Sequence, residues 1–241
     1  MNVKNSPLSP YWQYFSTTFQ YDTPYGKLVY EGMYKAEFMY EKTLLAEIKE
    51  KNIEGVIVEF GVSGGWRLKQ LVDSMKEVQL ERDVYGFDSF EGLPKPDYTY
   101  DSEFWKEGMY AADINDVKQY LKCSENPHIK LIKGWFSDIF KKDEVKNLEK
   151  IAFARIDCDL YHPAIECLDY LKERIVDNGI LVFDDWSNNL RIGETKAFYE
   201  WLPNSGWEFD FLLLNGWVHL FLRARKKREN EPENKVINDF T

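Results

Sequence analysis

The sequence predicts an α/β protein built around a mostly parallel β-sheet with helices on both faces. Short, continuously apolar runs alternate with amphipathic stretches between residues 55 and 202, and uninterrupted apolar runs are typical of strands buried on both faces. The last apolar stretch, residues 207–225, is expected to form two strands that turn near Asn215-Gly216. This adds a C-terminal antiparallel hairpin to the sheet.

The elements are assigned in chain order from hydrophobic spacing. The first helix is expected over residues 31–51, where Tyr34, Phe38, Leu45 and Ile48 recur at helical spacing. Beyond it, short apolar runs such as GVIVEF and GILVFDD read as buried strands, and stretches of helical periodicity separate or follow several of them. The expected strands span residues 55–60, 83–89, 128–134, 151–159 and 179–185, and the expected helices span residues 67–78, 113–122, 164–175 and 194–202.

The chain is expected to contain one main domain with a flanking segment at each end. Residues 1–52 are expected to form a lid and a helical extension, because three prolines in the first 30 residues break any long element there. Residues 53–225 contain the expected sheet. The charged residues 226–241 are expected to form a flexible tail.

A second covering segment is expected inside the main domain. The stretch 92–127 is long for a connection between a strand and a helix. Residues 95–112 and residues 1–30 are both irregular and rich in aromatic side chains, which pack well on a sugar or ring face. We therefore expect both to cover a ligand pocket and to be mobile without ligand.

Composition and charge exclude several classes of protein. A net charge of −10 disfavours nucleic-acid binding, because most of the surface would repel a phosphate backbone. No run of about 18 apolar residues occurs, so no membrane-spanning helix is expected. The first residues lack a charged start followed by an apolar stretch, and the three cysteines lack CxxC spacing. We therefore expect a reducing, cytoplasmic location without a disulfide framework or a zinc cluster.

A glycine-rich turn, EFGVSGG at residues 59–65, follows the first expected strand. Glycines let the backbone approach a ligand closely, and the start of a helix offers free N–H groups to an anion. The spacing differs from the GxGxxG of dinucleotide-binding proteins. Taken alone, the turn is equally consistent with a tight connection and with a ligand site.

Asp88, in YGFDSFEGLP, is expected at the end of the second strand. A carboxylate at that place commonly accepts hydrogen bonds from the ribose hydroxyls of a bound nucleoside. The alternative is a helix N-cap or a loop carboxylate. Because the glycine turn and Asp88 would lie at the same edge of a parallel sheet, together they favour a nucleoside-binding crevice.

Two pairs of aspartates follow the next two strands: Asp157 and Asp159, then Asp184 and Asp185. Neighbouring strands lie about 4.8 Å apart, so these carboxylates are expected close together. Crowded carboxylates raise each other's pKa, and a hard cation such as Mg²⁺, Ca²⁺ or Mn²⁺ removes the repulsion. The alternative is that each aspartate caps a helix. Two pairs on neighbouring strands favour a metal site.

Two other residues are weaker candidates near this edge. His162, in DLYHP, would line the same pocket, and Trp135, in KGWFSD, would stack on a nucleobase. A loop histidine and a packing aromatic are equal alternatives. The sequence contains no GxxxxGK[ST], which argues against a P-loop nucleotidase.

The ordered motifs VEFGVSGG, VYGFDSFEGLP, LIKGWF, RIDCDLYHP and GILVFDDW resemble the macrocin O-methyltransferase family. This resemblance implies a Rossmann-like class I methyltransferase sheet, with residues 53–225 as the methyltransferase domain. It implies S-adenosyl-L-methionine and Mg²⁺ as cofactors. The implied partner is a small-molecule acceptor, a sugar or polyol, with no nucleic acid and no membrane; a homo-oligomer is left open.

The resemblance also assigns roles to individual residues. The methionine end of the cofactor would lie against Glu59, Gly61, Val62, Ser63 and Gly64, the ribose against Asp88 and Ser89, and the adenine near Gly134, Trp135 and Phe136. Asp157, Asp184 and Asp185 would bind Mg²⁺. The glycine loop departs from the usual family order, because its aromatic and basic residues, Trp66 and Arg67, follow the glycines.

Together these roles predict methyl transfer to a hydroxyl of a small molecule, such as a sugar of a glycosylated metabolite. A divalent cation would lower the pKa of the hydroxyl, and a carboxylate would take its proton. Asp157 is expected to be this base, with Asp159 and His162 as alternatives. Two other functions stay open: a nicotinamide-dependent oxidoreductase, which leaves the aspartates without a role, and a catalytically silent protein that binds a nucleoside cofactor.

Overall fold

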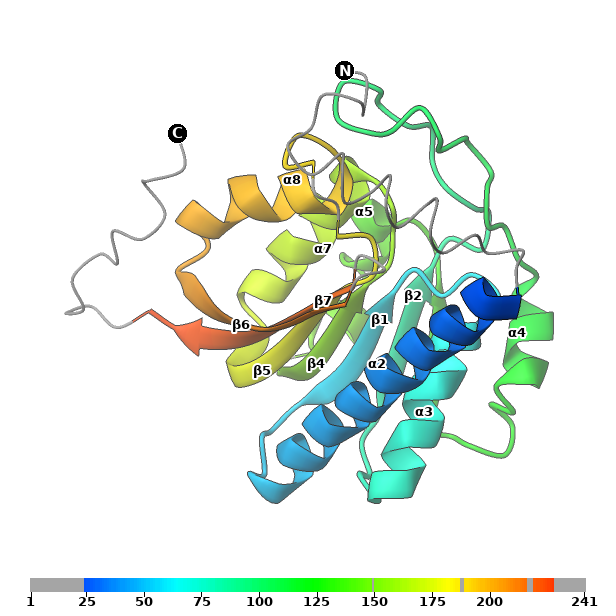
Figure 1. The fold of residues 1–241 in the computed structure, drawn as a ribbon, viewed down its shortest axis with the longest axis vertical. Coiled ribbons are helices and arrows are strands. Elements are labelled where there is room, and N and C mark those ends of the chain that lie inside the picture. Colours follow the sequence, from blue (N-terminus) through cyan, green and yellow to red (C-terminus); the bar gives the residue numbers. More distant parts are fainter. Residues whose placement is uncertain (1–23, 149, 187–188, 216–218, 228–241) are drawn as a thin grey trace.

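The computed structural model describes residues 24–148, 150–186, 189–215 and 219–227, and these form a seven-stranded sheet (Figure 1). The strand order is β3-β2-β1-β4-β5-β7-β6. The first five strands in that order run parallel, whereas β7 is antiparallel to β5 and to β6. The strands span Val56–Phe60 (β1), Val84–Asp88 (β2), Ile129–Lys133 (β3), Ile151–Ile156 (β4), Ile175–Phe183 (β5), Trp207–Asn215 (β6) and His219–Lys226 (β7).

Helices cover both faces of this sheet (Figure 1). Ile57 of β1 packs in the core beneath α2, α3 and α4, and its neighbour Val58 packs in the opposite core beneath α5, α6, α7 and α8. Successive strand residues point to opposite faces, so β1 contributes apolar side chains to both cores. The helices span Pro24–Glu50 (α2), Trp66–Val78 (α3), Ile114–Tyr120 (α4), Phe136–Ile139 (α5), Asp143–Lys146 (α6), Tyr161–Lys172 (α7) and Gly193–Trp201 (α8).

These findings confirm the predicted fold class, a mostly parallel Rossmann-like sheet closed by an antiparallel hairpin. Several boundaries differ from the sequence expectation. α7 spans Tyr161–Lys172 rather than residues 164–175, and β4 ends at Ile156 rather than at residue 159. The two largest differences are at the starts of α2 and β5. α2 begins at Pro24 rather than at residue 31, and proline is favoured in the first turn because its fixed φ suits a helix. β5 begins at Ile175 rather than at residue 179, with a shift of register against β4 near its start.

Three expectations fall wholly or largely outside the described residues. They are the lid expected over residues 1–30, of which the described residues 24–30 belong to α2, the turn expected near Asn215-Gly216, and the tail expected over residues 226–241. Within the part of the chain that the structure describes, no helix has both the length and the apolarity needed to cross a membrane.

The topology creates a crevice between β1 and β4. From β1 the chain continues outward through β2 and β3, then returns to the other side of β1 as β4 and continues through β5. Ligands of open parallel sheets bind where the strand order reverses, outside the carboxyl ends of the strands. The glycine turn, Asp88 and both aspartate pairs follow or end strands at this edge.

Candidate functional site

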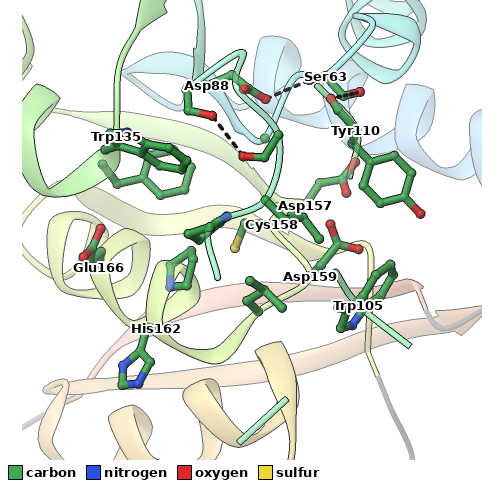
Figure 2. A pocket seen from close by; sticks show the side chains of 18 of the residues that line it. Ser63, Asp88, Trp105, Tyr110, Trp135, Asp157, Cys158, Asp159, His162 and Glu166 are labelled. Carbon is green, nitrogen blue, oxygen red and sulfur yellow. Dashed lines mark hydrogen bonds between the residues drawn. The ribbon is translucent and has the colours of Figure 1, made fainter. Parts of the chain in front are cut away.

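A cavity of about 530 Å³ opens at this edge of the sheet (Figure 2). That volume lies within the usual range for small-molecule and cofactor sites. Most of the predicted site residues line it, whereas the lining does not include Glu59, Val62 or Gly64. The predicted residues in the lining are Gly61, Ser63, Asp88, Ser89, Gly134, Trp135, Phe136, Asp157, Asp159, His162, Asp184 and Asp185.

Asp88 holds the glycine loop against the end of β2. Its Oδ2 accepts hydrogen bonds from the backbone N–H of Val62 at 2.7 Å and of Ser63 at 2.8 Å, and its Oδ1 accepts one from the backbone N–H of Phe90. A carboxylate has about four acceptor positions on its two oxygens. Asp88 therefore shapes the loop and keeps acceptor capacity toward the cavity.

Gly61 brings the loop into direct contact with the end of β4. Its φ is +88°, in the left-handed region that favours glycine, and a Cβ at this position would lie 1.6 Å from the carbonyl oxygen of Asp157. The backbone N–H of Asp157 also donates to the carbonyl of Phe60 at 2.9 Å. The sequence needs glycine here because two strand ends meet without room for a side chain.

Glu59 lies beneath the cavity rather than in its wall. Its side chain is fully buried and accepts a hydrogen bond from Arg155 at 3.2 Å, and Arg155 also pairs with Glu41 of α2. Burial raises the pKa of Glu59 to about 7, although the charge of Arg155 works in the opposite direction. Nothing in this arrangement brings Glu59 to a ligand, and its cofactor-binding role stays a prediction.

Asp157, Asp159 and Asp185 form a compact acidic group. One carboxylate oxygen from each lies within 4.8 Å of the others. Burial and the neighbouring carboxylates raise the pKa of Asp157 and of Asp185 well above their usual range, and burial raises that of Asp159 to about 7. The crowding expected from the sequence is present, with Asp159 as a member of the group.

Asp184 is paired with cations on the other side of the strand end. Its carboxylate lies 3.2 Å from Arg67 Nη2 and 3.4 Å from His219 Nε2, and both cationic residues also contact Glu37 of α2. Burial works to raise the pKa of Asp184, but the hydrogen bond from His219 and the nearby positive charges lower it overall. At His219, burial works to lower the pKa of the imidazole. The hydrogen bonds and charges of Asp184 and Glu37 outweigh it and raise this pKa to about 9.

These ion pairs show where the side chain of Arg67 lies, the basic residue that follows the glycines of the loop. Arg67, in the first turn of α3, is one of the two cationic residues that pair with Asp184 and Glu37, and His219 is the other. Asp184 nevertheless lines the cavity beside the acidic group. Its predicted role as a Mg²⁺ ligand stays a prediction.

Glu194 is a site residue that the sequence analysis missed. Its buried carboxylate accepts hydrogen bonds from the backbone N–H of Cys158 at 2.8 Å, of Asp159 at 3.1 Å and of Asp185 at 3.3 Å. It therefore ties together the two strand ends that carry the acidic group. The only signal in the sequence is an acidic residue in the first turn of a helix, which is common and says nothing about its partners.

The two weaker candidates both line the cavity. His162 is 60% exposed along its side chain, and its Nε2 lies 3.5 Å from the carboxylate of Asp97. Trp135 precedes α5 at the end of β3 and lies on the side of the cavity nearer Asp88 (Figure 2). The role of His162 as an alternative base and the role of Trp135 in stacking on the adenine both stay predictions.

The acidic group suits a hard divalent cation. Its donors are all carboxylate oxygens, the chemistry that Mg²⁺, Ca²⁺ and Mn²⁺ prefer. Arg67 and His219 compensate Asp184, but no salt bridge pairs Asp157, Asp159 or Asp185 with a basic side chain among the described residues. A cation at this point would offset both the burial and the mutual repulsion that raise the pKa values of these carboxyl groups.

A model of the macrocin-O-methyltransferase (TylF) family matches residues 21–200, which is most of the chain. A curated relative from Streptomyces olivaceus, 8-demethyl-8-(2,3-dimethoxy-alpha-L-rhamnosyl)-tetracenomycin-C 4'-O-methyltransferase, is 26% identical over 155 residues. That alignment covers 61% of this chain and 57% of the relative, so the chain spans little more than half the length of the curated relative it matches.

Solved structures share the fold. The calicheamicin methyltransferase CalS11 aligns with a TM-score of 0.65 at 21% identity, covering 91% of this chain and 93% of that one. The O-methyltransferase NovP aligns with a TM-score of 0.63 at 17% identity, covering 79% of this chain and 80% of that one. At these identities the likeness supports the class I methyltransferase fold.

Proposed function

The chain belongs to the macrocin O-methyltransferase family, and from this premise we propose that it transfers a methyl group from S-adenosyl-L-methionine to a sugar hydroxyl of a glycosylated small molecule. The observation that carries the proposal is one cavity with two chemically different parts. Asp88 and Trp135 would supply contacts to a nucleoside, and the acidic group of Asp157, Asp159 and Asp185 lines the same cavity. The rhamnosyl acceptor in the name of the curated relative supports a sugar as substrate.

The cofactor would lie along the carboxyl ends of β1, β2 and β3. Asp88 would accept a hydrogen bond from a ribose hydroxyl through the acceptor position that the N–H groups of Val62, Ser63 and Phe90 leave free. Trp135 would offer a ring face to the adenine. The glycine loop would hold the methionine end, since its backbone lines the cavity at Gly61 and Ser63.

We propose that Asp157, Asp159 and Asp185 hold Mg²⁺, with Asp184 as a candidate fourth ligand. When bound, a divalent cation lowers the pKa of an acceptor hydroxyl and helps to position it. Glu194 fixes the backbone of both strand ends, so the three carboxylates keep a defined spacing.

The proton of the acceptor hydroxyl must leave as the new O–CH₃ bond forms. Asp157 is the proposed base, because its carboxylate lines the cavity next to the glycine loop that would hold the methyl donor. Asp159 is the alternative within the acidic group. His162 is a third candidate, although its imidazole is engaged by Asp97.

Calorimetry tests the proposal in two steps. S-adenosylhomocysteine, and separately NAD, is titrated into the protein, and Mg²⁺ is then titrated into the S-adenosylhomocysteine complex. We expect S-adenosylhomocysteine and Mg²⁺ to bind. A triple Asp157→Asn, Asp159→Asn, Asp185→Asn variant should lose Mg²⁺ binding but keep S-adenosylhomocysteine binding. Asp169→Asn, which changes an exposed carboxylate of α7, is the matched control.

The outcomes separate the functions. A protein that binds NAD instead of S-adenosylhomocysteine would be an oxidoreductase candidate, and the methyltransferase proposal would fail. Equal Mg²⁺ binding by the triple variant and the unmutated protein would remove the proposed metal site. Loss of Mg²⁺ binding by Asp184→Asn alone would make Asp184 a ligand as well.

A further inference from the structure

The long loop between β2 and α4, residues 89–113, contacts the starts of α7 and α8. The carbonyl oxygen of Tyr100 accepts a hydrogen bond at 2.7 Å from the backbone N–H of Gly193, the first residue of α8. The next residue, Asp101, accepts one through Oδ1 at 2.8 Å from the backbone N–H of Tyr161, the first residue of α7. Two consecutive residues of the loop therefore hold the starts of the helices that follow the two aspartate pairs.

Asp101 supplies a cap that α7 does not supply for itself. The first turn of α7 has no acidic residue, and its N-cap residue, Leu160, has no side chain that accepts a hydrogen bond. The N–H of Tyr161 is one of the four at a helix start that have no partner within the helix. Asp101 accepts it from 60 residues away, and its Oδ2 accepts the backbone N–H of Asp97 at 2.9 Å. Although Asp101 lines the cavity, its side chain is 5% exposed and both oxygens are bound to backbone.

This cap fixes the chain directly after Asp159, a member of the acidic group. Asp159 has a φ of +62°, a left-handed conformation that is uncommon outside glycine and persists where the surroundings hold it. Before this point, Glu194 accepts the N–H of Asp159 at 3.1 Å. After it, Asp101 accepts the N–H of Tyr161. The direction of the Asp159 carboxylate therefore depends on two other carboxylates that bind backbone, one from α8 and one from the loop.

Side chains join the same three segments. The rings of Tyr100 and Tyr161 have centroids 4.7 Å apart, and the Nζ of Lys196 in α8 lies 5.1 Å and 5.3 Å from these two centroids. Such cation–ring contacts are attractive. The hydroxyl of Tyr161 also donates to the carboxylate of Glu200 in α8 at 2.7 Å. The loop, α7 and α8 therefore form one connected unit around the acidic group.

We infer that Asp101 is a positioning residue for the proposed cation site, holding the start of α7 so that the carboxylate of Asp159 stays grouped with those of Asp157 and Asp185. Because the contact comes from the loop, the position of the loop and cation binding should be coupled, and each should stabilise the other. The alternative is that Asp101 stabilises α7 as an ordinary cap. The inference rests on the proposed Mg²⁺ site and adds a residue outside the acidic group on which that site depends.

The first test is calorimetry of Mg²⁺ binding to the full chain saturated with S-adenosylhomocysteine. Asp101→Ala should weaken Mg²⁺ binding by about fivefold or more, the lower end of the usual range for coupled sites. Asp113→Ala is the matched control, because Asp113 caps α4 through the N–H of Asn115 at 2.7 Å, is exposed and lies outside the cavity lining. It removes a cap of the same kind and should leave Mg²⁺ affinity within about twofold.

Hydrogen exchange of the same complex gives the second readout. In the unmutated protein, Mg²⁺ should slow the exchange of backbone amides in residues 97–101 and 159–164, because coupling acts in both directions. In Asp101→Ala this protection by Mg²⁺ should be lost from residues 97–101. Thermal melting shows whether each variant is folded, and Asp101→Asn, which keeps one acceptor oxygen, replaces Asp101→Ala if the alanine variant is unfolded.

The outcomes separate positioning from capping. Equal Mg²⁺ affinity in Asp101→Ala and Asp113→Ala would overturn the inference and leave Asp101 as a cap. Unchanged exchange of residues 97–101 when Mg²⁺ binds to the unmutated protein would overturn the coupling of loop and cation site. If the unmutated protein binds no Mg²⁺ at all, the proposed metal site itself fails, and the inference fails with it.

Discussion

The carboxylate of Asp88 accepts a hydrogen bond from the backbone N–H of Ser63 at 2.8 Å, although 25 residues separate the two in the chain. The glycine loop that follows β1 is therefore held by the residue that ends β2. One carboxylate shapes the loop and faces the cavity that the cofactor is proposed to occupy. Changes at Asp88 should consequently affect both loop structure and cofactor binding.

Replacing Asp88 with alanine removes these acceptors and the proposed ribose contact. We expect Asp88→Ala to weaken S-adenosylhomocysteine binding by about 1.5–3 kcal/mol, the usual range for charge-assisted hydrogen bonds. Calorimetry measures the effect, and Asp169→Ala on the exposed face of α7 serves as the control. Unchanged affinity in Asp88→Ala would remove Asp88 from the cofactor site.

Two glycines of the same loop should respond differently to alanine. Gly61→Ala places a methyl group against the carbonyl of Asp157 and forces a left-handed φ, so we expect a loss of roughly 3 kcal/mol or more in the free energy of unfolding. A Cβ on Gly64 has no atom within 4 Å, so Gly64→Ala should change stability by less than about 1 kcal/mol. Urea unfolding compares them, and equal effects would contradict the close contact at Gly61.

The buried cation Arg67 should matter far more for stability than Lys69, which is partly exposed on the same helix. Arg67→Met leaves the buried carboxylates of Glu37 and Asp184 with His219 as their remaining cationic partner, which should cost about 3 kcal/mol. Lys69→Met breaks only the partly exposed pair with Asp73 and should cost less than about 1 kcal/mol. Similar unfolding free energies for the two variants would show that the Arg67 pairs are not important for stability.

Glu59 should make the stability of the protein depend on pH near neutrality. Its pKa is raised to about 7 in the folded state, mainly by burial, so the folded protein holds this proton more tightly than the unfolded chain. The resulting stabilisation is fully present below the unfolded pKa of about 4.3 and is lost as the pH rises through about 7, with a slope of at most about 1.4 kcal/mol per pH unit.

The measurement is the free energy of unfolding between pH 5 and 8, without added metal. We expect it to fall with rising pH, and we expect a shallower slope for Glu59→Gln, which cannot ionise. Glu54→Gln, which changes an exposed glutamate paired with Lys150, should keep the slope of the unmutated protein. Identical slopes for Glu59→Gln and the unmutated protein would mean that Glu59 does not titrate in this range.

The sequence by itself determined the order of the strands and of the longer helices along the chain, and the residue types at the strand ends, whereas the four-residue helices α5 and α6 were not predicted. Apolar runs such as Val56–Phe60 and the spacing of residues such as Leu45 and Ile48 are local patterns that reflect burial directly. The same holds for Asp88 and the two aspartate pairs. In a parallel sheet, any residue just beyond a strand's carboxyl end lies at the same edge, so sequence position alone brings these carboxylates together.

Only the tertiary structure decided which carboxylates share a group and which have cationic partners. Asp184 and Asp185 are adjacent in the chain, yet Asp184 contacts Arg67 and His219 while Asp185 lies with Asp157 and Asp159. Their directions depend on the rotation of the chain as it leaves β5 and on side chains that arrive from α3 and β7. A local pattern contains neither piece of information.

The same reason applies to Glu59 and Glu194. Glu59 faces Arg155 because the parallel register of β1 and β4 pairs these two residues, and that register is set by packing across the whole sheet. Glu194 reaches the backbone of Asp159 from 35 residues away because α8 packs against the ends of β4 and β5. Both contacts depend on distances between elements, which hydrophobic spacing along the chain does not encode.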